Sequence, residues 1–168
     1  MKIDYVKFQN FMLYKKLNKK FSDKDIVGIL AEYKYNPRKS NRAGKSTVTE
    51  GIIYTLFGIS RAKKEVQLIH HGEEYMLNEV GLIDDDGNTF TVKRGRDHKN
   101  KGLLECDWVD KKSEAQEAIN QLLGCNGEEF ELTNFFKQSD INQFMELGAA
   151  KKKEHLMKWF KKLHWPKL

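Results

Sequence analysis

The chain has 168 residues, of which 39% are hydrophobic and 32% are charged, and its formal net charge is +6. This length suits one domain, and the sequence holds neither an apolar run of 18 residues nor a signal-peptide pattern, so we expect no membrane partner. Two cysteines are too few for a disulfide framework or a zinc site, so we expect reduced thiols with packing roles. The positive charge allows nucleic acid as a partner, and a surface that serves only solubility explains it equally well.

Two strands are predicted in the first 31 residues. The pattern of apolar residues from Lys2 to Phe11 indicates a strand whose faces shift near its middle. The continuous apolar run from Ile26 to Ala31 is typical of a central strand buried on both faces. Between them, the lysine-rich segment from Lys15 to Phe21 is predicted to be a polar edge strand or a loop.

The sequence Gly44-Lys45-Ser46-Thr47 follows the second strand and precedes a predicted helix that ends at Gly58. A turn of small residues lets successive backbone N–H groups face phosphates, and the helix adds its positive N-terminal end. Lys45 would then reach the β- and γ-phosphates, and Ser46 would hold Mg²⁺. These residues predict a site for a nucleoside triphosphate.

This segment departs in two ways from a standard phosphate-binding loop. Lys39 occupies the place of the first glycine, and the residues from Glu32 to Arg38 lengthen the connection from the strand. We therefore expect a looser or differently shaped loop, and a solvated basic turn is the alternative interpretation.

An antiparallel hairpin is predicted further along the chain. Its strands cover 80–83 and 89–94 around an Asp-Gly turn, and residues 103–109 add a third strand. The acidic pair Asp84-Asp85 resembles the Mg²⁺-binding acids of many ATPases, but the Gly-Asn that follows is typical of a hairpin, so we assign no catalytic carboxylate.

Helix signals flank the last third of the chain. A capping box at 113–116 predicts the start of a helix that ends at Gly124. Apolar residues recur at helical spacing within 151–168 until Pro166 would interrupt the helix. This last helix could pack on its own domain, form the root of a coiled coil, or contact DNA.

Two smaller basic or metal-binding patterns carry little weight. Adjacent His70 and His71 lack a further ligand at suitable spacing, so we do not predict a metal site there. The cations from 93 to 101 could contact a phosphate backbone, and a solvated hairpin face explains them equally well.

The segment Phe135-Phe136-Lys137-Gln138-Ser139-Asp140-Ile141 completes a recognisable order of motifs. A P-loop near the N-terminus, a hairpin-rich insertion and then this segment resemble the N-terminal half of an SMC-type ATPase head. The resemblance is greatest to the SbcC-like DNA double-strand-break repair ATPases of the ABC superfamily, and it covers essentially the whole chain. It implies an α/β P-loop NTPase fold, an ABC-type head lobe with an antiparallel hairpin-rich sheet, central parallel strands and flanking helices. It also implies a lobe at 1–150 and a basic helix at 151–168.

The resemblance also implies roles for individual residues. Lys45 and Gln138 would act in catalysis, Thr47 would touch the α-phosphate, and Ser46 together with Gln138 would hold Mg²⁺. ATP and Mg²⁺ are therefore the expected cofactors. The residues that would bind the nucleotide are Asn41, Arg42, Ala43, Gly44, Lys45, Ser46 and Thr47.

By the same resemblance, the partners would be DNA, a C-terminal half of the head, a second identical head and an SbcD-like nuclease, in the cytoplasm or at the nucleoid. The sequence holds no convincing Walker B acids or signature helix, so it looks truncated, and we expect this chain alone to bind ATP but to hydrolyse it poorly. The alternative is a non-enzymatic basic DNA-binding module with a degenerate phosphate loop. A small-molecule kinase is disfavoured because no lid-like arginine cluster is present.

Overall fold

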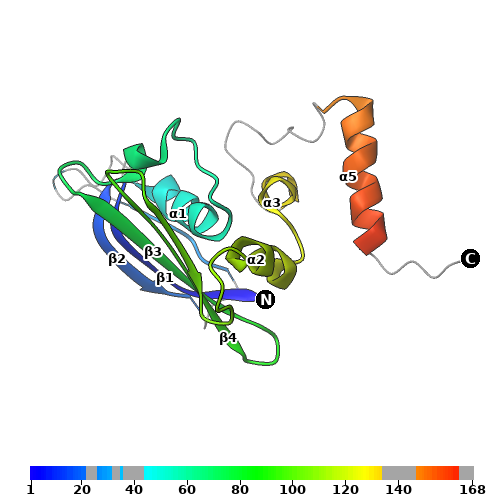
Figure 1. Cartoon of the computed structure of the whole chain (residues 1–168), viewed down its shortest axis with the longest axis horizontal. Helices are drawn as coiled ribbons and strands as arrows, with labels where there is room; N and C mark the ends of the chain where they lie inside the picture. The colour runs from blue at the N-terminus through cyan, green and yellow to red at the C-terminus, as the bar shows by residue number, and fades with distance from the viewer. Residues whose placement is uncertain (22–25, 32–34, 36–43, 134–146, 163–168) are drawn as a thin grey trace, which may run out of the picture. The chain divides into compact units, whose positions relative to one another are not determined.

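The computed structural model describes residues 1–21, 26–31, 35, 44–133 and 147–162. The chain divides into two compact units, Met1–Gly124 and Cys125–Leu168. In the first unit, a five-stranded antiparallel sheet in the order β2-β1-β3-β4-β5 carries helices α1 and α2 on one face (Figure 1). Its elements are β1 (Lys2–Phe11), β2 (Tyr14–Lys20), α1 (Lys45–Phe57), the 3₁₀ helix η1 (Glu65–Leu68), β3 (Tyr75–Ile83), β4 (Thr89–Asp97), β5 (Gly102–Cys106) and α2 (Ala115–Leu123).

The alternation along β1 explains how the sheet obtains a buried and an open face. Val6 and Phe8 are buried toward the helices, whereas Lys7 between them is exposed on the other face. The pairing of β1 with β3 shifts register between Ile3 and Tyr5, which confirms the predicted change of face along this strand. Edge strand β2 and the β3–β4 hairpin also lie where the sequence predicts them.

The β3–β4 turn is closed by its acidic residues. Asp84 accepts hydrogen bonds from the backbone N–H of Asp86 at 3.0 Å and of Asn88 at 2.8 Å, and Gly87 adopts a positive φ of 87°. The Asn88 side-chain amide also donates to Asp84, and these hydrogen bonds lower the pKa of that carboxyl below its usual value. Asp84, the first acid of the Asp84-Asp85 pair, therefore has a structural role in this turn.

Helix α1 packs very closely on the sheet at one glycine. A Cβ atom on Gly51 would lie only 2.5 Å from Cζ of Phe8 and 3.1 Å from Cε1 of Phe11. Both rings are buried in β1 and belong to the main hydrophobic core. The helix ends as predicted at Gly58, which adopts a left-handed φ of 72° and donates its N–H to the Tyr54 carbonyl at 2.8 Å.

The apolar run at 26–31 differs from its prediction, because these residues form no strand. Ile26 and Leu30 are each 92% exposed. A strand buried on both faces needs neighbouring strands and covering layers, and the described residues provide neither for this segment. All strand pairs of the described sheet are antiparallel, so the parallel strands expected at its centre are not among the described residues.

Helix α2 is confirmed, but the capping box predicted at its start is wrong. Glu114, not Ser113, is the N-cap residue, and no side chain caps this helix. Gln116, which would have completed the box, instead directs its amide to the backbone of α1. A tertiary contact has replaced the local one that the sequence pattern indicated.

The second unit contains α3 (Gly127–Thr133) and α5 (Ala149–Lys162). A capping box precedes α3, in which Glu129 N–H donates to Asn126 Oδ1 at 2.9 Å and Asn126 N–H donates to Glu129 Oε2 at 3.2 Å. Helix α5 confirms the helical spacing noted near the C-terminus, and the division of the chain at residue 150 stays a prediction. Among the described residues, no helix combines the length and apolarity needed to span a membrane.

Gly51→Ala should destabilise the protein. Alanine favours a helix by about 1 kcal/mol over glycine, but its Cβ would displace the rings of Phe8 and Phe11, and overpacking costs about 1–3 kcal/mol. Chemical denaturation measures the balance. Gly28→Ala in the same unit, where no atom lies within 4 Å of the added Cβ and φ is not left-handed, is the control and should shift the free energy of unfolding by less than about 0.5 kcal/mol. Equal effects of the two changes would contradict the close packing.

A second prediction concerns Glu79 on the open face of the sheet. This carboxylate accepts hydrogen bonds from Lys7 Nζ at 2.8 Å and from Tyr5 Oη at 2.7 Å, and Lys93 Nζ lies at 3.6 Å. Burial raises the pKa of Glu79, but these partners outweigh burial, so the pKa lies below its ordinary value of 4.5.

Because the folded state binds this proton less tightly than the unfolded state, the contribution of Glu79 to stability is present above pH 4.5. It is lost as the pH falls through the lowered pKa. The difference in urea midpoint between the wild type and Glu79→Gln should therefore shrink on acidification below pH 4.5. A difference that stays constant from pH 7 to pH 3 would contradict this assignment.

Candidate functional site

The N-terminal end of α1 begins at a glycine that the backbone requires. Gly44 is the N-cap residue with φ 84° and ψ 8°, and its carbonyl accepts the Thr47 N–H at 3.0 Å. A Cβ at this position would lie 3.1 Å from Oη of Tyr14 and 3.5 Å from Cδ1 of Leu13. Both the left-handed conformation and the available space therefore select glycine.

The charge at this helix end suits an anion. The first turn of α1 contains no acidic residue, and no side chain caps its N-terminus. The first N–H groups of a helix lack intrahelical acceptors, and the helix dipole adds partial positive charge at the same end. Lys45 is half-buried and Ser46 is exposed, whereas Thr47 is buried. An ammonium and a hydroxyl are thus available beside a positive helix end, which fits phosphate and Mg²⁺.

The structure brings together four of the predicted site residues and does not describe the others. Gly44, Lys45, Ser46 and Thr47 lie on one helical turn. The remaining predicted residues, Asn41, Arg42, Ala43 and Gln138, lie outside the described residues. Their roles stay predictions, as do the specific contacts of Lys45, Ser46 and Thr47 with nucleotide and metal.

Tyr14 of β2 is a residue at this site that the sequence did not indicate. Its hydroxyl donates to the Gly44 carbonyl at 3.1 Å. Burial raises the pKa of Tyr14, so the hydroxyl remains a donor at neutral pH. Thirty positions separate the two residues, and no local pattern could have linked them.

Glu50, in the middle of α1, is buried and holds the segment that follows the helix. Its carboxylate accepts hydrogen bonds from Arg61 through Nε at 3.1 Å, Nη2 at 2.6 Å and the backbone N–H at 3.2 Å. The hydrogen bonds and charge of Glu50 raise the pKa of Arg61. This paired carboxylate is not a free base for catalysis.

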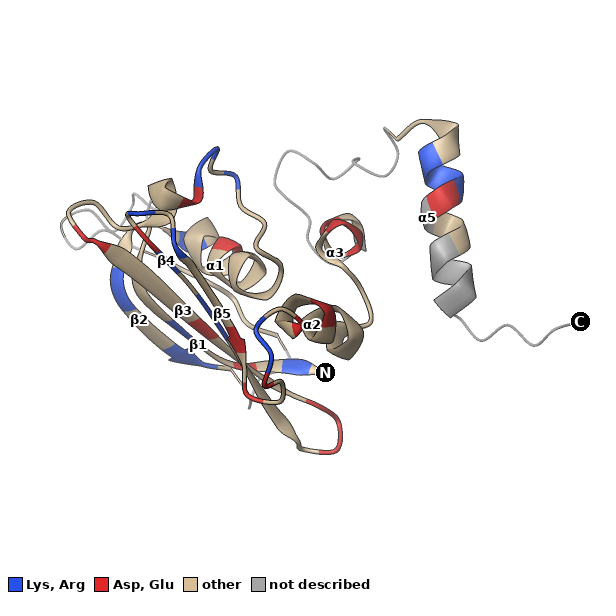
Figure 2. Ribbon diagram, viewed as in Figure 1, with Lys and Arg blue, Asp and Glu red and all other residues tan. Residues whose placement is uncertain are grey.

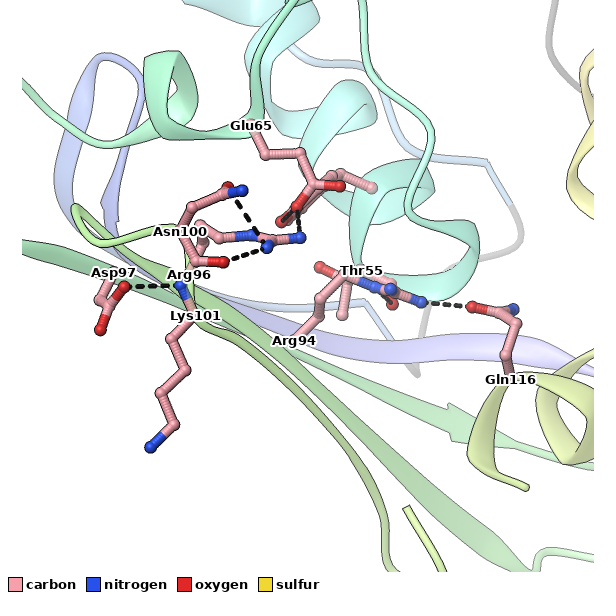
Figure 3. A network of polar contacts seen from close by, with 9 residues as sticks. Thr55, Glu65, Arg94, Arg96, Asp97, Asn100, Lys101 and Gln116 are labelled. Carbon is pink, nitrogen blue, oxygen red and sulfur yellow. Dashed lines mark hydrogen bonds and ion pairs between the residues drawn. The ribbon is translucent and has the colours of Figure 1, made fainter. Parts of the chain in front are cut away.

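The arginines of the hairpin lie in a polar network and not on a solvated face (Figure 3). Arg94 donates to backbone carbonyls at the end of α1, and Arg96 forms an ion pair with Glu65 of η1. The same Glu65 accepts a hydrogen bond from Tyr54 at 3.1 Å, and burial, followed by the charge of Glu65, raises the pKa of Tyr54 to about 12. Both arginines therefore serve the fold. Of the two interpretations left open for the cations at 93–101, the solvated face is wrong for Arg94 and Arg96.

The remaining polar candidates have structural partners. Asp84 closes the hairpin turn, and exposed Asp85 pairs with the N-terminal amine at 3.3 Å. His70 Nδ1 lies 2.7 Å from the Met12 carbonyl. Within the described ranges, no group of three or more His, Cys, Asp or Glu side chains could hold a metal ion. Neither Cys106 nor Cys125 forms a disulfide among the described residues, and burial raises the pKa of Cys106 to about 11.

Comparisons with known proteins agree with this fold. The sequence profile of the AAA domain family matches residues 39–142. A DNA double-strand break repair Rad50 ATPase of Methanocaldococcus jannaschii is 25% identical over 157 residues. That match covers 91% of this chain but only 15% of the relative's length.

Among solved structures, one from a study of ATP-driven dimerization and DNA-stimulated activation of SMC ATPases has a TM-score of 0.69 at 18% identity, covering 93% of this chain and 98% of that one. An Smc head domain with a coiled coil and joint derived from Pyrococcus yayanosii also has a TM-score of 0.69, at 19% identity. The match covers 93% of this chain and 31% of that one. The recombination mediator protein RecF-ATP has a TM-score of 0.59 at 21% identity, and the match covers 92% of this chain and 36% of that one.

The profile match covers more than half of the chain, and the architecture of the described residues is that of SMC and RecF heads. The chain therefore belongs to the AAA domain family and has the fold of an SMC/SbcC-like ATPase head.

Proposed function

We propose that this chain is the ATP-binding lobe of an SbcC/SMC-like ATPase that acts in DNA double-strand-break repair or recombination. The observation that carries the proposal is the N-terminal end of α1, where Gly44 supplies a left-handed turn and the first helical turn contains no acid that would repel a phosphate. Lys45 and Ser46 provide the cation and the hydroxyl at that end. The similarity to a Rad50 ATPase supports the biological setting.

Each residue of the turn has a distinct part in this proposal. The backbone N–H groups from Asn41 to Gly44 bind phosphate oxygens, and Lys45 neutralises charge on the β- and γ-phosphates. Bound Mg²⁺, held by Ser46 and Gln138, would supply electrostatic stabilisation to the triphosphate. A neutral amide such as that of Gln138 can contact metal and water without adding charge.

The exposed apolar segment at 26–31 supports the proposal that this chain binds a partner lobe. Ile26 and Leu30 present large apolar side chains that no described residue covers. Burying such a side chain stabilises a complex by about 1.5–3 kcal/mol. We infer that this segment joins the sheet of a C-terminal half of the head. Two complete heads would then enclose ATP between them and control access of DNA and of a partner nuclease.

One observation favours the alternative, a basic DNA-binding module. Strand β2 carries Lys15, Lys16, Lys19 and Lys20, all exposed, and no acidic residue (Figure 2). Such a strand could follow a phosphate backbone. Exposed lysines also protect an edge strand from pairing with other chains, so this feature alone does not establish DNA binding.

The first functional prediction is that ATP with Mg²⁺ binds the wild-type chain and binds Lys45→Ala about 10- to 100-fold more weakly, since a charge-assisted contact contributes about 1.5–3 kcal/mol. Calorimetric titration measures both affinities, with Lys16→Ala on β2 as a control that should bind like the wild type. DNA binding with a steep salt dependence and no response to ATP in any variant would favour the alternative module.

The second functional prediction is that the isolated chain hydrolyses ATP negligibly. Its candidate acids, Asp84 and Asp85, lie in the β3–β4 turn and have structural partners. Phosphate release by the purified chain measures turnover, with Lys45→Ala as the background. Robust turnover that Asp85→Asn abolishes would overturn this prediction.

A further inference from the structure

The C-terminal end of α1 receives side chains from two other elements. The last carbonyl groups of a helix lack intrahelical donors, and the last turn of α1 contains no basic residue of its own. Arg94 of β4 donates through Nε to the Thr55 carbonyl at 2.9 Å and through Nη2 to the Leu56 carbonyl at 3.4 Å. Gln116 of α2 donates through Nε2 to the same Leu56 carbonyl at 3.0 Å.

Arg94 and Gln116 also hold each other. Arg94 Nη2 donates to Oε1 of Gln116, as the dashed line in Figure 3 shows. The Gln116 amide additionally donates to Asn120 Oδ1 at 3.2 Å, which fixes its orientation on α2. A guanidinium and an amide thus join β4, α1 and α2 at a single point.

The charge of Arg94 matches the helix end that it contacts. Burial lowers the pKa of this guanidinium from its ordinary value, but arginine stays protonated in proteins. A cation at a helix C-terminus interacts favourably with the partial negative charge there. The Arg94 guanidinium also packs closely on Gly58 at the end of the helix, because a Cβ on Gly58 would lie 3.1 Å from Nη1 of Arg94.

We propose that Arg94 and Gln116 form a clamp that sets the position of α1 and, through it, the position of the phosphate-binding turn at the opposite end. Both are positioning residues for the nucleotide, so this inference rests on the proposed function. Helix α1 has 13 residues and is therefore a rod of about 20 Å. At its other end the Tyr14 hydroxyl contacts the Gly44 carbonyl, but no described side chain caps the first N–H groups, so a shift at the clamped end would be carried along the rod to the turn at Lys45.

The coupling between the clamp and nucleotide binding must work in both directions. If the clamp favours the nucleotide-binding position of α1, bound nucleotide must favour the clamp by the same factor. The β3–β4 hairpin and α2 would then respond to nucleotide through Arg94 and Gln116, although neither residue touches the phosphates. A purely local cap would stabilise the last turn of α1 without either effect.

The experiment compares the wild type with Arg94→Met, Gln116→Leu and the control Ile119→Val. Ile119 is fully buried on the same helix as Gln116, so the control weakens the core while the clamp stays intact. Amide hydrogen exchange without nucleotide follows both ends of α1, and calorimetry measures ATP affinity with Mg²⁺. Arg94→Lys, which keeps the charge but loses the planar fork, replaces Arg94→Met if that variant does not fold.

We expect both clamp variants to raise exchange at residues 48–51 as well as at residues 55–58, and to weaken ATP binding about 5- to 10-fold. The control should leave the ratio of exchange at the two ends and the ATP affinity unchanged. Faster exchange confined to 55–58, or an unchanged affinity in clamp variants when the wild type binds ATP, would overturn the inference.

Failure of the proposed function gives a different result. If the wild type itself binds no ATP, the proposed function is contradicted. The hydrogen-exchange measurement still tests the clamp in that case. Faster exchange at 48–51 as well as at 55–58 in the clamp variants supports the clamp, and faster exchange at 55–58 alone refutes it.

Discussion

The close packing of α1 on the sheet is the contact on which the rest of the described structure depends. Gly51 allows the helix to approach the rings of Phe8 and Phe11, and a Cβ atom there would displace both rings. This approach places the first turn of α1 beside Tyr14 of β2 and its last turn beside Arg94 of β4. One apolar contact thus aligns the polar contacts at both helix ends.

The two ends of α1 differ in how the fold treats their charge. At the C-terminal end, Arg94 and Gln116 donate to carbonyls that lack an intrahelical donor, and Arg94 supplies a compensating cation. At the N-terminal end, the first turn contains no acid and no described side chain caps it, so nothing among the described residues offsets the partial positive charge. An uncompensated helix N-terminus beside Lys45 and Ser46 is a physical reason to expect a phosphate, independent of any family resemblance.

The sequence predicted local structure well and long-range structure poorly, for physical reasons. The hairpin turn and the end of α1 at Gly58 follow from local chemistry, namely turn acids and a left-handed glycine. The capping box failed because Gln116 gains a contact with α1 that no local pattern encodes. The prediction of a strand at 26–31 was wrong. An apolar run indicates that a segment favours burial, but it does not show whether neighbouring strands are present to bury it.

Chemical-shift mapping of backbone amides during an ATP·Mg²⁺ titration tests the central claim most directly, because it locates the ligand as well as detecting it. The account predicts that the largest shifts occur at Gly44–Thr47 and that the amides of β2 change little. Largest shifts along the lysines of β2, with no change at Gly44–Thr47, would contradict a phosphate site at the end of α1. That result would identify the basic strand as the anion-binding surface.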